Sequence, residues 1–133
     1  MKSDNKHGGG RFLARLGLAW MVAWGLLASP TADAHARLLR SSPAAEVELG
    51  SAPRVIALWF NEQPEAEFSS IKLLDGTGEV LVEGAPSRTA DANGLELRLP
   101  ETLPAGEYRV RYRVLSVDGH VIEDGFGFRI GTP

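Results

Sequence analysis

The sequence has 133 residues, which is enough for one domain and hardly for two. It contains no cysteine, so disulfides, thiolate metal sites and thiol nucleophiles are excluded. The 17 acidic and 14 basic side chains give a net charge of −3, and without its first 34 residues the chain carries 15 against 10, a net charge of −5. An acidic domain of this kind is a poor candidate for binding nucleic acid or anionic lipid, both of which attract clustered Lys and Arg.

Residues 1–34 are predicted to be a cleavable secretory signal peptide. Four basic side chains precede an uncharged apolar run of 13 residues, 16–28. Ala32 and Ala34 then follow in the small-x-small pattern of a cleavage site. A membrane-spanning helix needs about 20 apolar residues, so an uncleaved anchor is the less favoured alternative. Cleavage after Ala34 would make His35 the first residue of an exported domain.

The remaining part, residues 35–133, is predicted to form strands throughout. Some runs are almost continuously apolar, which is typical of a strand covered on both faces, and others alternate between apolar and charged side chains. Prolines fall between the runs, and no window of 11 or more residues has helical periodicity. About seven short strands separated by turns predict an all-β fold, a seven-stranded antiparallel β-sandwich of immunoglobulin-like type. The clearest runs are 54–60, two pieces flanking a Gly-rich turn at Asp75–Gly78, 94–99, 107–115 and 125–130.

The expected domain has two histidines, and both occur in contexts that favour a metal site. If His35 is the first residue, its α-amine and its ring Nδ1 can chelate one ion, because their ordinary pKa values of about 8 and about 6.5 make both easy to deprotonate. Asp118 and His120 are two residues apart, which places both side chains on one face of an extended backbone, and Gly119 between them permits a tight bend. Three nitrogens and one oxygen suit Cu(II) or Ni(II), and suit Zn(II) less well.

Other interpretations of the same residues remain open. The dipeptide Asp-Gly occurs three times after residue 34, so an ordinary hairpin turn explains Asp118–Gly119 without a metal. Cleavage two residues later, after Ala36, would discard His35 and leave Arg37 first. A metal-free immunoglobulin-like interaction module is therefore one alternative.

From His35 to the last strand, the sequence resembles the CopC family of periplasmic copper-resistance proteins. The matching pieces are a histidine after a signal peptide, the segment SSPA, FNE at the end of the first long strand, LPAGEYRVRYR, and VSVDGH before a final GFGF strand. Two departures from the family pattern stand out. The chain has DGHV where the family frequently has DGHP, and its two methionines, Met1 and Met21, lie in the predicted signal peptide, so no Met-rich Cu(I) site is expected.

The resemblance implies a Greek-key sandwich of cupredoxin-like or immunoglobulin-like topology that binds one Cu(II) ion. Carried over by position, the ligands are His35, Asp118 and His120, and Glu62 falls where the family often has a carboxylate close to the metal; a solvated strand-end carboxylate is the alternative for Glu62. The implied protein is periplasmic, monomeric and not an enzyme. Its implied partner is an inner-membrane copper transporter of CopD type.

An enzyme is the second alternative, because lytic polysaccharide monooxygenases also bind copper through an N-terminal histidine and a second histidine. In this chain, however, Asp118 would occupy a coordination position that those enzymes tend to leave free for oxygen.

Overall fold

The computed structural model describes residues 36–132, and this part of the chain is built of strands with one short 3-10 helix, η1. Seven of the strands have five residues or more, against about seven expected, although β1 is not among the runs predicted from the sequence; β2 and β6 have two residues each. No helix within residues 36–132 is long and apolar enough to cross a membrane. The elements are β1 (Leu38–Ser42), β2 (Glu48–Leu49), β3 (Val55–Phe60), η1 (Ala66–Phe68), β4 (Ser70–Asp75), β5 (Val80–Gly84), β6 (Ser87–Arg88), β7 (Gly94–Arg98), β8 (Gly106–Leu115) and β9 (Val121–Ile130).

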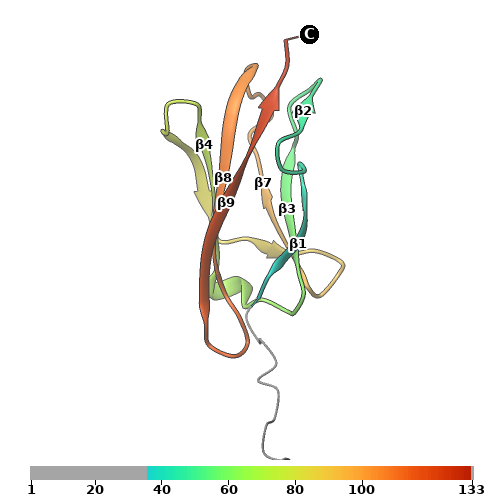
Figure 1. Cartoon of the computed structure of the whole chain (residues 1–133), viewed down its shortest axis with the longest axis vertical. Coiled ribbons are helices and arrows are strands. Elements are labelled where there is room, and N and C mark those ends of the chain that lie inside the picture. The colour runs from blue at the N-terminus through green and yellow to red at the C-terminus, as the bar shows by residue number, and fades with distance from the viewer. Residues whose placement is uncertain (1–35, 133) are drawn as a thin grey trace, which may run out of the picture. The chain divides into compact units, whose positions relative to one another are not determined.

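The strands form two sheets that pack face to face, as Figure 1 shows. One sheet has the order β1-β3-β7-β6 and the other the order β2-β9-β8-β4-β5. Neighbouring strands are antiparallel except β2 and β9, which run parallel over two residues. The predicted all-β sandwich is therefore confirmed, and the parallel pair is the one departure from the expected antiparallel pairing within the described residues.

The alternating sequence of β8 produces one buried and one exposed face. Tyr108, Val110, Tyr112 and Val114 are each at most 7% exposed, whereas the arginines between them face solvent. Because successive side chains of a strand point to opposite sides, this spacing fixes which face of β8 packs on the other sheet. The core contains apolar side chains from both sheets: Ile56, Leu58, Phe60, Leu95 and Leu97 from one, and Ile71, Leu73, Tyr108, Val110, Tyr112, Val114, Phe126, Phe128 and Ile130 from the other.

The continuous apolar run of β3 is explained by cover on both of its faces. Ile56, Leu58 and Phe60 point into the core. On the opposite face Ala57 is buried, and Trp59 lies beneath the guanidinium of Arg40, whose Cζ is 3.7 Å from the ring centroid. The expectation of a strand covered on both faces is thus confirmed, with a cation–π contact covering the outer face.

Three parts of the chain that are distant in sequence meet at one end of the sandwich, the lower end in Figure 1: the start of β1, the end of β3 with the loop after it, and the turn between β8 and β9. The pair Leu38–Phe60 brings the start of β1 to the end of β3, and the pair Leu115–Val121 closes the turn between β8 and β9. The loop that contains η1 joins them through a β-bridge between Pro64 and Ser116. Asp118, His120 and Glu62, three of the four site residues expected from the sequence, lie at this end.

Candidate metal centre

The turn between β8 and β9 brings Asp118 and His120 into direct contact. His120 Nδ1 lies 2.8 Å from Asp118 Oδ2, and the two side chains are 57% and 22% exposed, respectively. The sequence predicts an extended backbone from Asp118 to His120, but the backbone here forms a turn. Gly119 has a φ of 88°, and the N–H of Ser116 donates to His120 O over 2.9 Å. A residue other than glycine is strained at this φ, so the bend depends on Gly119.

A buried serine, Ser116, donates a hydrogen bond to the carboxylate of Asp118. Ser116 is 1% exposed, and its hydroxyl donates to Asp118 Oδ1. The backbone N–H of His120 donates to the same oxygen over 3.1 Å. These donors stabilise the ionised carboxylate, and the Ser116 hydroxyl first, then the amide and ring of His120, lower the pKa of Asp118 to about 2. The carboxylate is therefore anionic at any physiological pH.

Glu62 follows β3 and has a buried carboxylate oxygen that lacks a partner. Within the described residues, its Oε1 is buried and accepts no hydrogen bond. The loop that carries Glu62 is tied to the β8–β9 turn, since Glu65 N donates to Leu115 O over 2.9 Å. An isolated buried carboxylate oxygen is costly unless a cation or donor satisfies it, so Glu62 has the property expected of a residue near a metal ion. Residues 36–132 nevertheless contain no group of three or more His, Asp or Glu side chains close enough to hold an ion.

His35, the fourth expected ligand, lies outside the described residues. The described chain begins at Ala36, which is 2% exposed and belongs to the core. Arg37 is held against the end of β3, because its N–H donates to Asn61 Oδ1 and its carbonyl accepts from Asn61 N over 3.0 Å. The chain therefore enters the sandwich beside the residue that precedes Glu62.

Two polar residues at this end, Ser116 and Asn61, were not expected from the sequence. Ser116 contacts the turn residues, and Asn61 fixes the entry of β1. Serine and asparagine are common in turns and at strand ends, so neither carries a specific signal. Ser116 is distinguished by its burial and Asn61 by its long-range contact with Arg37.

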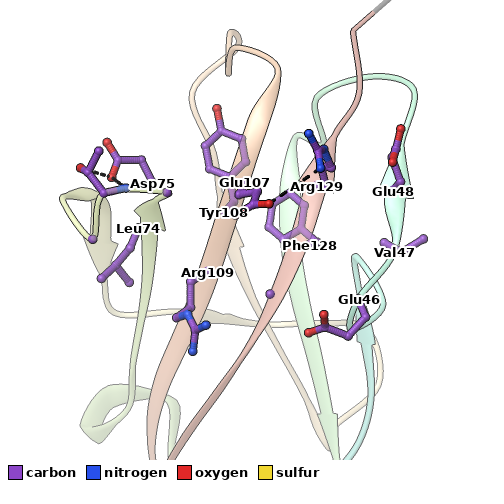
Figure 2. Close-up of a pocket in the computed structure, with 14 residues that line it drawn as sticks. Glu46, Val47, Glu48, Leu74, Asp75, Glu107, Tyr108, Arg109, Phe128 and Arg129 are labelled. Atoms are coloured by element: carbon purple, nitrogen blue, oxygen red, sulfur yellow. Dashed lines mark hydrogen bonds and ion pairs between the residues drawn. The ribbon is translucent and has the colours of Figure 1, made fainter.

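A cavity of about 570 Å³ lies at the opposite end of the sandwich, and Figure 2 shows the side chains that line it. Asp75 of the β4–β5 turn lies on one side of it, and the rings of Tyr108 and Phe128 stack in its wall with centroids 5.5 Å apart. Asp75 Oδ1 is already occupied, because it accepts hydrogen bonds from Thr77 and from Glu79 N. None of the expected metal ligands lines this cavity.

Comparison with known proteins gives one consistent family. The family model of the CopC domain matches residues 38–131. Copper resistance protein C of Pseudomonas syringae pv. tomato is 32% identical over 124 residues, which cover 89% of this chain and 98% of that protein. Copper transport protein CutJ of Bacillus subtilis is 32% identical over 102 residues, 76% of this chain, and the chain spans only 19% of CutJ.

A solved structure agrees with these matches. The crystal structure of CopC from Methylosinus trichosporium OB3b is 38% identical and superimposes with a TM-score of 0.69, covering 74% of this chain and 95% of that one. Sequence and fold therefore lead to the same group of proteins.

Proposed function

The chain belongs to the CopC family of copper resistance proteins, whose members bind copper, and from this premise we propose that it binds one Cu(II) ion in the periplasm and sequesters it or delivers it to a membrane copper transporter. In this proposal residues 1–34 are removed as a signal peptide and residues 35–133 form the copper-binding domain. The ligands are His35, Asp118 and His120, with Glu62 beside them.

The observation that carries the proposal is the contact between Asp118 Oδ2 and His120 Nδ1. The two atoms are 2.8 Å apart. Bonds of about 2.0 Å to a square-planar ion place neighbouring ligand atoms about 2.8 Å apart. The separation of these two donor atoms therefore matches that of neighbouring ligands of a square-planar Cu(II) ion. Nitrogen and anionic oxygen are also donors that Cu(II) accepts well.

His35 would supply two further nitrogens after cleavage behind Ala34. In the proposal His35 lies beside Asp118 and His120, which is supported by the buried position of Ala36, the first described residue, at this end of the sandwich. The α-amine exists only when His35 is the first residue. In this proposal the signal peptidase thus creates half of the metal site.

Glu62 has a supporting role in the proposal. Its unpartnered Oε1 is a buried acceptor on the loop that is tied to the β8–β9 turn. A carboxylate there offsets the positive charge of the ion and occupies an axial position or accepts a hydrogen bond from a ligand.

The proposed role is binding without catalysis. The amine, the two histidines and Asp118 fill four positions around Cu(II), which leaves no equatorial position for oxygen or a substrate. Delivery to a transporter is supported by CutJ, a copper transport protein. The segment of CutJ that is similar to this chain makes up 19% of its length. The domain is expected to act as a monomer.

The decisive experiment combines N-terminal mass determination of the exported protein with Cu(II) titration followed by electron paramagnetic resonance. We expect a chain that begins at His35, one Cu(II) per chain, and hyperfine coupling to nitrogen. D118N and H120A each remove a proposed ligand, so each should weaken binding by about 100-fold or more, beyond the usual cost of losing an outer-shell partner.

Asp75→Asn is the matched control for Asp118→Asn. Asp75 is also an aspartate in an Asp-Gly turn, but it lies at the opposite end of the sandwich and its Oδ1 is engaged within its own turn. D75N should bind copper as the unaltered protein does. Tight Cu(II) binding by a chain that begins at Arg37 would contradict the proposed site.

A further inference from the structure

Two buried polar side chains stand out among residues 36–132, and both are serines at the end that carries the proposed site. Ser69 is 5% exposed and Ser116 is 1% exposed. Both lie where the loop after β3 meets the end of β8. A buried hydroxyl is costly unless it is hydrogen-bonded, so the contacts of each serine indicate what it does.

The two serines have different partners. Ser69 Oγ donates to Glu65 O over 2.7 Å and accepts from Leu115 N over 3.2 Å, so it joins backbone to backbone. Ser116 Oγ donates to the carboxylate of Asp118, which is a side chain of the proposed site, and it also lies 3.2 Å from the backbone oxygen of His120. The first serine fastens the loop to β8, and the second acts on a ligand.

The contacts of Asp118 are divided between its two oxygens. Oδ1 accepts from the Ser116 hydroxyl and from His120 N, whereas Oδ2 faces His120 Nδ1. With Oδ1 engaged by two donors, the carboxylate cannot rotate about its last bond without losing both. Oδ1 is thus occupied by hydrogen bonds, and Oδ2 remains beside His120 Nδ1.

We propose that Ser116 is a positioning residue for copper: its hydroxyl holds Asp118 so that Oδ2 alone binds the ion, next to His120 Nδ1. This inference rests on the proposed function. Without the hydroxyl, the carboxylate turns more freely and presents either oxygen or both. Ser116 sits in the rigid part of the turn, since its own N–H donates to His120 O and its backbone bridges to Pro64.

Ser116→Ala tests this role, with Ser69→Ala as the matched control. Both substitutions remove a buried hydroxyl where the loop after β3 meets the end of β8, but only S116A removes a contact to Asp118. We expect S116A to weaken Cu(II) binding by about 10–100-fold, the usual cost of losing an outer-shell partner, and to change the copper hyperfine coupling in the paramagnetic resonance spectrum. S69A should leave the spectrum unchanged and the affinity within about threefold.

A double-mutant cycle with Asp118→Asn separates a role through Asp118 from a general structural role. If Ser116 acts through Asp118, S116A should not weaken copper binding further in the D118N background. Equal effects of S116A in both backgrounds, or equal effects of S116A and S69A, would overturn the inference. If S116A does not fold, S116G, which also removes the hydroxyl and adds no metal-binding group, is measured in the same way.

These measurements distinguish a failure of the proposed ligand set from a failure of the role proposed for Ser116. If D118N binds Cu(II) as tightly as the unaltered protein, the proposed ligand set fails and the role of Ser116 fails with it. If D118N weakens binding and S116A does not, only the role of Ser116 fails.

Discussion

The three Asp-Gly dipeptides of the described chain give their aspartates different surroundings. Asp75 accepts hydrogen bonds within its own turn, from Thr77 and Glu79, and Asp124 accepts from the next amide in β9. Asp118 alone of the three contacts a histidine and a buried serine. An ordinary turn, the alternative that the sequence left open for Asp118–Gly119, accounts for the contact of both Asp75 and Asp118 with the amide two residues on, but it does not require the further contact of Asp118 with the buried Ser116. Sequence could not separate them, because the distinguishing Ser116 hydroxyl is identified only by its burial.

The pKa of Asp118 should depend on Ser116 in the metal-free protein. The Ser116 hydroxyl is the largest cause that lowers this pKa to about 2, so S116A should raise it toward the ordinary value near 3.8. Because the folded-state pKa is depressed, the carboxylate stabilises the fold above about pH 4, and this contribution is lost as the pH falls toward 2. Carbon-detected NMR titration measures the pKa directly, with the lowered pKa of Asp75 as an internal reference that S116A should not move. An unchanged Asp118 pKa in S116A would contradict this assignment.

The sequence predicts the interior strands and the hairpin of β4 and β5, but not the edge strand β1 or the start of β9. The alternation of β8 and the apolar run of β3 correspond to the observed strands within one residue at each end. The last strand was expected over 125–130 but begins at Val121, because pairing with β8 continues through Glu123 and Asp124, which interrupt the apolar alternation. β1 was not predicted, since an edge strand needs few apolar side chains and its pairing with β3 is a long-range contact.

Gly125 in β9 is required by its neighbour in β8. A Cβ at this position would collide with the backbone oxygen of Val110, which cannot move without breaking the pairing of the two strands. We expect Gly125→Ala to lower the free energy of unfolding by about 1–3 kcal/mol, as overpacking does in a core. Gly50→Ala is the control, because no atom lies within 4 Å of the Cβ that it would add. Urea unfolding of both variants measures the difference, and equal stabilities would show that β9 can shift away from β8.

For the molecule as a whole, the proposed site draws on three segments separated by the length of the domain. Its residues come from position 35, from the loop after β3, and from the turn after β8, and the sandwich brings the last two to one end. The residue types followed from the sequence and from the family resemblance. The meeting of the loop after β3 with the turn after β8 did not, because it depends on long-range contacts such as the bridge between Pro64 and Ser116.

Because these segments converge only in the folded state, Cu(II) should stabilise the whole domain. A ligand that binds only the folded chain adds about 2.7 kcal/mol at a free concentration 100 times its Kd, which corresponds to a rise in Tm of about 10 °C or more for a domain of this size. The chain that begins at His35 should show this rise in a calorimetric scan, and D75N should show it equally. H120A and a chain that begins at Arg37 should show little of it, since each lacks nitrogens that the other segments cannot replace. If the chain beginning at Arg37 is stabilised as strongly as the one beginning at His35, copper binds without the amine, and the N-terminal half of the proposed site is wrong.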